Sequence, residues 1–186
     1  MNFPSVNPAL ARALAAREYL EPTPVQAAVL QAGTDGRDLV VSAQTGSGKT
    51  VAYGLAFAPT LLGSEELFPA RSGAPLALII APTRELAMQV HAELSWLYAE
   101  TGAKIVSCVG GMDARGERRL LANGCHIVVG TPGRLRDHQG QRRTRAGGEI
   151  FIRSQQGRRE SKAIGHGLAG AGLGGNNKVP SLGFRL

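Results

Sequence analysis

The sequence predicts an α/β fold in which a parallel sheet is covered by helices on both faces. Two observations predict it. Short apolar runs alternate with segments of helical periodicity, and residues 43–50 read Ala-Gln-Thr-Gly-Ser-Gly-Lys-Thr directly after one such run. A strand, a glycine-rich loop and a helix in this order are typical of a phosphate-binding loop. The chain has 186 residues without an internal repeat, which corresponds to one domain.

The expected elements follow one another along the first 138 residues. An amphipathic helix over 9–20 ends at Pro22, and a second helix begins after Pro24. Strands are expected at 38–42, 76–81, 104–109 and 125–130, and helices at 49–62, 84–99 and 112–122. Residues 63–75, which contain charges, proline and glycine, indicate a surface loop.

The charge distribution divides the chain near residue 138. Residues 1–138 contain 12 basic and 12 acidic side chains, whereas residues 139–186 contain 9 and 2, so the whole net charge of +7 lies in the second part. That part also has 11 glycines and no sustained helical or strand period, which predicts a basic, disordered tail. Basicity therefore says little about the partners of the folded domain at 1–138.

The phosphate-loop pattern assigns chemistry to particular residues. Glycines at 46 and 48 let backbone amides approach phosphate oxygens without a Cβ in the way. Lys49 is expected to reach the β- and γ-phosphates, and the Thr50 hydroxyl to reach Mg²⁺. The phosphates would lie at a helix N-terminus, which favours negative charge.

A segment upstream of the loop indicates that the base is adenine. Residues 19–26 offer the Tyr19 ring and the Gln26 amide, and an amide matches the N6/N7 edge of adenine. This favours ATP over GTP as the nucleotide.

Two turns downstream indicate a seat for a phosphodiester backbone. Ala-Pro-Thr-Arg-Glu-Leu-Ala at 81–87 and Gly-Thr-Pro-Gly-Arg at 130–134 each end an apolar strand with a threonine, an arginine and a helix start. Each turn offers free backbone amides and a cation, Arg84 or Arg134, and Thr83 can cap the helix that follows it. Such groups bind phosphates without contacting the bases. Gly110 and Gly111 allow a similarly close approach at a third strand end.

Other features narrow the class of protein. No apolar stretch is long enough to span a membrane, and the N-terminal residues lack a secretion-type pattern, so we expect a cytoplasmic protein without a membrane partner. Cys108 and Cys125 lack metal-ligand spacing and are expected to be buried and unreactive. The sequence does not indicate the oligomeric state.

With these motifs, the sequence resembles the DEAD-box family of ATP-dependent RNA helicases, specifically the first of its two RecA-like domains. The resemblance runs from Phe3 to about Arg136, and five motifs stand in the family's order and spacing. It implies ATP, Mg²⁺ and RNA as ligands. For the nucleotide, the resemblance implies that Tyr19 and Gln26 contact adenine. The residues implied to bind the phosphates and the metal are Thr45, Gly46, Ser47, Gly48, Lys49 and Thr50. Of these, Lys49 and Thr50 are the catalytic groups that the chain contains. For the RNA backbone it implies Thr83, Arg84, Gly111, Thr131 and Arg134.

The sequence departs from the family pattern at two places. Glu18 stands where the family usually has glycine before the aromatic residue. The Asp-Glu-Ala-Asp motif expected some twenty residues past the second turn is absent, and residues 149–156 read Glu-Ile-Phe-Ile-Arg-Ser-Gln-Gln. The Ser-Ala-Thr motif and the family's second domain, with its arginine finger, are absent as well. The sheet is therefore expected to be incomplete on its C-terminal side, and the chain to bind ATP and RNA without hydrolysing ATP or unwinding RNA.

Three interpretations of the tail remain open. The abrupt change after residue 138 fits a reading-frame change in the coding sequence, a basic RNA-binding arm, or a divergent fold. The chain as a whole is accordingly part of a helicase, a non-enzymatic ATP- and RNA-binding module, or a non-functional product.

Overall fold

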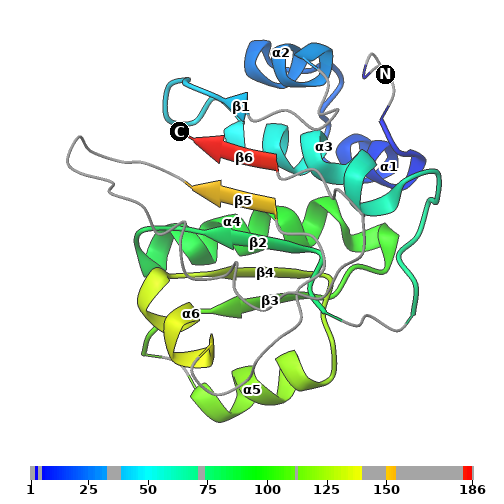
Figure 1. Cartoon of the computed structure of the whole chain (residues 1–186). Helices are drawn as coiled ribbons and strands as arrows, with labels where there is room; N and C mark the ends of the chain where they lie inside the picture. Colours follow the sequence, from blue (N-terminus) through cyan, green and yellow to red (C-terminus); the bar gives the residue numbers. More distant parts are fainter. Residues whose placement is uncertain are drawn as a thin grey trace, which may run out of the picture.

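A computed structural model of the chain describes residues 3, 6–32, 39–70, 74–111, 113–139, 150–153 and 182–185. Its centre is a six-stranded sheet with the strand order β1-β6-β5-β2-β4-β3 (Figure 1). All pairings in the sheet are parallel. Parallel neighbours require crossover connections, and here the crossovers within residues 39–139 are helices.

The N-terminal half begins with two helices before the first strand. Helix α1 (Pro8–Ala16) starts at Asn7, whose side chain accepts a hydrogen bond from the backbone amide of Ala9. Helix α2 (Pro24–Ala32), strand β1 (Leu39–Val40) and helix α3 (Lys49–Leu62) follow, and α2 packs along α3. Proline at the first position of α1 and α2 fixes the backbone where no hydrogen bond is lost.

From β2 to α6, strands alternate with α-helices, and one 3-10 turn follows α4. The elements are β2 (Ala77–Ile80), α4 (Arg84–Leu97), the 3-10 turn η1 (Ala99–Thr101), β3 (Ile105–Cys108), α5 (Ala114–Ala122), β4 (Ile127–Gly130) and α6 (Pro132–Gln139). The bounds of β2, α4, β3, α5 and β4 agree with the elements expected from periodicity to within a few residues, whereas η1 was not expected and α6 was expected only as a helix start.

Side chains of the central strands alternate between two cores, because successive residues of a strand point to opposite faces. On one face Ile79, Ile127 and Val129 join a large core with α1, α2, α3 and α4. On the other face Val106, Cys108, Cys125 and Val128 form a smaller core, against which Leu121 of α5 and Leu135 of α6 pack. Helices therefore cover both faces, as the sequence predicts.

Helices α3 and α4 approach closely at a glycine. A Cβ on Gly54 would clash with Leu97 and lie 3.1 Å from a Leu94 methyl, so a larger residue at this point of α3 would have to displace these leucine side chains. The buried Tyr98 hydroxyl donates a hydrogen bond to the Gly54 carbonyl over 2.7 Å. The two helices that begin at the phosphate loop and at the first strand-end turn are thus held together.

The structure corrects one expectation about residues 139–186. We predicted this tail to lack secondary structure, but it contributes β5 (Ile150–Arg153), paired with β2, and β6 (Leu182–Arg185), paired with β5 and β1. Four-residue strands are too short to show a period against a Gly- and Arg-rich background. Apart from Gln139 in α6, the other tail residues lie outside the described part, where the prediction of disorder has no test.

In the described ranges, no helix combines the length and the apolar character that crossing a membrane requires.

Candidate nucleotide and nucleic-acid interface

The sequence motifs meet at one edge of the sheet. Because all strands are parallel, their carboxyl ends point to the same side, and the register pairs Ile80 and Cys108 with Gly130. The phosphate loop follows β1, and the turns at 81–87, 109–111 and 131–134 follow β2, β3 and β4. Ligands of open α/β sheets bind at this edge.

The phosphate loop depends on two glycines in the left-handed conformation. Gly46 has φ +80° and Gly48 has φ +85°, a region in which a side chain is strained. Gly48 is also the N-cap of α3 and provides no side-chain cap, so the first amides of α3 lack that partner. The loop therefore presents a helix N-terminus suited to an anion.

Polar groups in the loop fit a phosphate ligand. Lys49 Nζ folds back and donates to the carbonyls of Ala43 and Gln44, each over 2.6 Å. The Ser47 hydroxyl is buried and has no hydrogen-bond partner in the described part of the chain. Thr50 lies half-buried in the first turn of α3, and Thr45 is exposed. The Lys49 ammonium and the unpaired Ser47 hydroxyl are both able to donate hydrogen bonds to phosphate oxygens.

Gln26 lies under the phosphate loop, in contact with Gly48. Its side chain is fully buried, its Oε1 accepts from the Thr23 amide over 3.0 Å, and its Nε2 donates to the Gly48 carbonyl over 3.4 Å. A Cβ on Gly48 would lie 2.7 Å from this Nε2, and Thr23 Oγ1 donates to the Ser47 carbonyl. The predicted adenine contact would require this amide to leave the loop.

The Tyr19 side chain packs against Trp96 of helix α4. Its ring stacks on Trp96 with centroids 5.7 Å apart, and the Arg17 guanidinium lies 4.8 Å from the Trp96 ring. An open hollow of about 520 Å³ adjoins Tyr19 and is lined by residues 17–21. Glu18 has φ +60°, which explains why a glycine suits this position.

Thr83 and Arg84 lie at the N-terminus of α4 and are exposed. The Thr83 hydroxyl accepts from the Leu86 amide over 3.2 Å and thereby caps the helix, as predicted. A Cβ on Gly111, which has φ +80°, would lie 2.5 Å from Arg84 Nη1. The structure therefore brings together a cation and a glycine from two predicted RNA-contacting turns.

Arg134 is held more tightly than Arg84. Its side chain is 15 % exposed, and its Nε donates to Glu117 Oε2 over 2.7 Å. The nearby Thr131 amide donates to the Cys108 carbonyl, and its own carbonyl accepts from Leu135 at the start of α6. The hydrogen bond to Glu117 raises the pKa of the Arg134 guanidinium.

Glu117 is a central residue that the sequence analysis missed. Its carboxylate is 7 % exposed, Oε1 accepts from the Val109 amide, and Oε2 contacts both Arg134 and His138. A single glutamate in a polar helix gives no sign of burial, although α5 has a strongly one-sided pattern. Only the packing of α5 against β3 and α6 reveals its role.

The two cysteines are buried, as expected, and both are free thiols. Burial raises the pKa of the Cys108 thiol to about 12, and the negative charge of Glu117 adds to that effect. The Cys125 thiol has a pKa raised by burial to about 11.

A comparison with protein families now decides the class. The DEAD/DEAH box helicase family matches residues 23–153, which is more than half of the chain. The chain belongs to this family. The match also extends past the boundary at 138 that we drew from composition and includes β5.

Full-length relatives are considerably longer than this chain. It is 38 % identical over 133 residues to the ATP-dependent RNA helicase RhlB of Xanthomonas oryzae pv. oryzae, covering 72 % of this chain and 23 % of that protein. It is 37 % identical over 131 residues to the ATP-dependent rRNA helicase RRP3 of Lodderomyces elongisporus, covering 70 % and 25 %. The chain thus spans about a quarter of the length of these relatives.

Solved DEAD-box structures share the fold. The yeast DEAD-box splicing factor Prp28 superimposes with a TM-score of 0.69 at 28 % identity, covering 80 % of this chain and 36 % of that one. The RNA helicase Prp28 from Chaetomium thermophilum, which is bound to ADP, gives 0.67 at 35 % identity, with coverages of 81 % and 37 %. A hypothetical ATP-dependent RNA helicase from Sulfolobus tokodaii gives 0.66 at 28 % identity, with coverages of 79 % and 40 %. The predicted RecA-like α/β class is confirmed.

Proposed function

We propose that this chain is the ATP- and RNA-binding part of a DEAD-box RNA helicase, and that by itself it does not hydrolyse ATP or unwind RNA. The observation that supports this most directly is the shared sheet edge: the phosphate loop and the turns at 81–87, 109–111 and 131–134 all follow carboxyl ends of parallel strands. One ligand at the loop and another along the turns would therefore lie on the same side of the domain.

For the nucleotide, the loop would hold the phosphates. Lys49 would exchange the carbonyls of Ala43 and Gln44 for phosphate oxygens, and the unpaired Ser47 hydroxyl would gain a partner. Thr50 stands where its hydroxyl would contribute to holding Mg²⁺, which supplies charge neutralisation for the phosphates.

For the base, Tyr19 and Gln26 remain the proposed contacts. Tyr19 lines the open hollow at residues 17–21, where its ring would be one aromatic contact for an adenine ring. Gln26 would exchange its bond to the Gly48 carbonyl for the adenine edge, so base recognition and loop geometry would be linked. Support comes from the similar Chaetomium thermophilum protein, whose structure holds ADP.

For RNA, the proposed contacts are sequence-independent. Arg84 beside Gly111 offers an exposed cation where no side chain blocks the backbone, and Thr83 lies at the helix N-terminus next to it. Thr131 and Arg134 provide the equivalent turn after β4, with Arg134 held in place by Glu117.

The proposal of binding without turnover rests on β5. This strand pairs with β2 at the centre of the sheet and reads Ile-Phe-Ile-Arg, with Ser154 next in the sequence. No carboxylate stands at its end, where the family places the acidic pair that holds Mg²⁺ and orients the attacking water. Without such a pair, catalysis loses groups on which phosphoryl transfer depends.

The test uses the purified 186-residue chain. Calorimetry should detect ATP binding, with GTP competing poorly against ATP, and that preference should disappear in Gln26→Ala. Phosphate release should equal the buffer control with and without RNA. RNA-stimulated hydrolysis that Lys49→Ala abolishes would overturn the binding-only proposal, and an absence of ATP binding would overturn the nucleotide assignment.

A further inference from the structure

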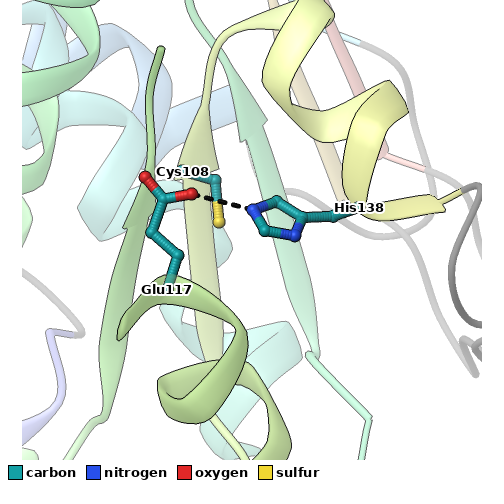
Figure 2. A group of neighbouring side chains, drawn as sticks. All are labelled: Cys108, Glu117 and His138. Atoms are coloured by element: carbon teal, nitrogen blue, oxygen red, sulfur yellow. Dashed lines mark hydrogen bonds and ion pairs between the residues drawn. The ribbon is translucent and has the colours of Figure 1, made fainter. Parts of the chain in front are cut away.

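Three side chains of metal-binding types meet on the sheet face covered by α5 and α6. Cys108 ends β3, Glu117 lies in α5, and His138 lies in the last turn of α6. One ligand atom of each, a sulfur, a carboxylate oxygen and an imidazole nitrogen, all lie within 4.8 Å of one another (Figure 2). These residues are far apart in sequence, and none belongs to the phosphate loop or to the strand-end turns.

The cluster is enclosed. Cys108 is 1 % exposed, and the side chains of Glu117 and His138 are 7 % and 13 % exposed. His138 Nε2 already lies 2.8 Å from Glu117 Oε2, and the Glu117 carboxylate is oriented by the Val109 amide and Arg134. A carboxylate fixed by neighbouring donors is the arrangement found around metal ligands in proteins.

The donor set indicates the class of cation. Thiolate, imidazole and carboxylate together suit Zn²⁺ and similar borderline divalent ions, whereas Mg²⁺ and Ca²⁺ prefer oxygen ligands only. Three protein ligands leave a fourth position of a tetrahedral site for water.

We propose that Cys108, Glu117 and His138 form a binding site for Zn²⁺ or a chemically similar divalent ion, separate from the nucleotide site. The ligands are Cys108 Sγ, a Glu117 carboxylate oxygen and His138 Nε2. With zinc–ligand distances of about 2.0 to 2.3 Å, the ion fits between atoms at this spacing after small side-chain rotations.

Binding balances in protons and charge. The buried Cys108 thiol is neutral without metal, so it releases one proton as the sulfur–metal bond forms. In the metal-free chain His138 Nε2 carries the hydrogen that points to the Glu117 carboxylate, so this hydrogen must leave before Nε2 binds the ion. A neutral ring does this by shifting its proton to Nδ1, whereas a cationic ring, which already has a proton on Nδ1, releases the Nε2 proton as a second one. Two negative ligands then offset the divalent charge beside Arg134.

Co²⁺ is the spectroscopic probe, because cobalt bound to a thiolate absorbs in the near-ultraviolet. The chelator-treated chain, kept reduced, should bind one Co²⁺ with this charge-transfer band, and added Zn²⁺ should remove the band. Cys108→Ser should abolish the band, whereas Cys125→Ser should keep it, since Cys125 is the other buried thiol of the same small core.

A second pair of variants tests the site in case the Cys108→Ser variant does not fold. His138→Gln, at the end of α6, should weaken Co²⁺ binding at least tenfold with unchanged circular dichroism. His91→Gln, which alters a histidine of α4 outside the cluster, should bind as the unmodified chain does. The proposal is overturned if the wild-type chain shows no thiolate band. It is also overturned if the band survives Cys108→Ser, or if a well-folded His138→Gln variant binds Co²⁺ with full affinity.

Discussion

At the phosphate loop, Lys49 and Gln26 direct their hydrogen bonds to the loop itself, whereas at the end of β2 the side chain of Arg84 is exposed and lies beside a glycine. Both regions lie on one edge of one sheet. In the proposed function a nucleotide would therefore replace existing internal contacts, while an RNA backbone would meet the Arg84 cation without rearrangement. Arg134 is the exception on the RNA side, because Glu117 holds it.

The largest expected effect is a difference in the free energy of unfolding between the Arg134→Ala and Arg84→Ala variants. Arg134→Ala should lower the free energy of unfolding by about 2 kcal/mol, because it leaves the buried Glu117 carboxylate with fewer partners. Arg84→Ala should change it by less than about 0.5 kcal/mol, as is usual for exposed side chains. Urea unfolding followed by circular dichroism measures both. Equal losses would remove the distinction between a held and an exposed arginine.

The next effect concerns the nucleotide. Lys49→Ala should weaken ATP binding at least tenfold, about 1.4 kcal/mol, since Lys49 is the cation of the phosphate loop. Calorimetry with ATP and Mg²⁺ gives the dissociation constant. The matched control is Lys104→Ala, an exposed lysine that contacts the Ala70 carbonyl and lies before β3, at the opposite edge of the sheet. If both lysine variants bind ATP like the parent chain, the loop assignment fails.

A smaller effect is expected on RNA. Arg84→Ala should weaken binding of single-stranded RNA about three- to tenfold, with similar losses for unrelated sequences, and reduce the slope of log K against log salt by about one. Fluorescence anisotropy at several salt concentrations measures both. Arg119→Ala, in the last turn of α5, serves as the control because that turn lies away from the carboxyl edge. Equal losses in the two variants would indicate nonspecific charge alone.

The smallest expected effect is a change in the free energy of unfolding on substitution of Glu18, the residue before Tyr19. Glu18 is the one non-glycine residue with positive φ in the part of the chain that the structure describes. Glu18→Gly should raise the free energy of unfolding by about 0.5 to 1 kcal/mol, because relief of left-handed strain exceeds the entropy cost of glycine. Glu18→Ala retains a Cβ and should give no such gain. A stabilisation of the same size in both would assign the effect to the lost charge.

The sequence was informative where one segment determines its own structure. The phosphate loop, the Thr83 cap and the alternation of strands and helices depend on neighbouring residues, and each was predicted. The contact between Gln26 and Gly48 was not, because residue type suggested a base contact and the loop geometry was unknown.

The larger omissions arise from contacts between distant segments. Cys108, Glu117 and His138 meet only through the packing of α5 and α6 on β3, and no spacing along the chain encodes that meeting. The short strands β5 and β6 likewise depend on partners elsewhere in the sheet, since β5 pairs with β2 and β6 pairs with β1. A polar, glycine-rich background hides such strands from a search for periodicity.

The position of Trp96 has a spectroscopic consequence. It is the single tryptophan of the 186 residues, its indole Nε1 donates to Glu93, and its ring lies against Tyr19 and Arg17. Indole fluorescence from this chain therefore originates at one point beside the hollow at residues 17–21. A base that displaces or covers the Tyr19 ring would alter the emission, so the unlabelled protein reports on that segment by itself.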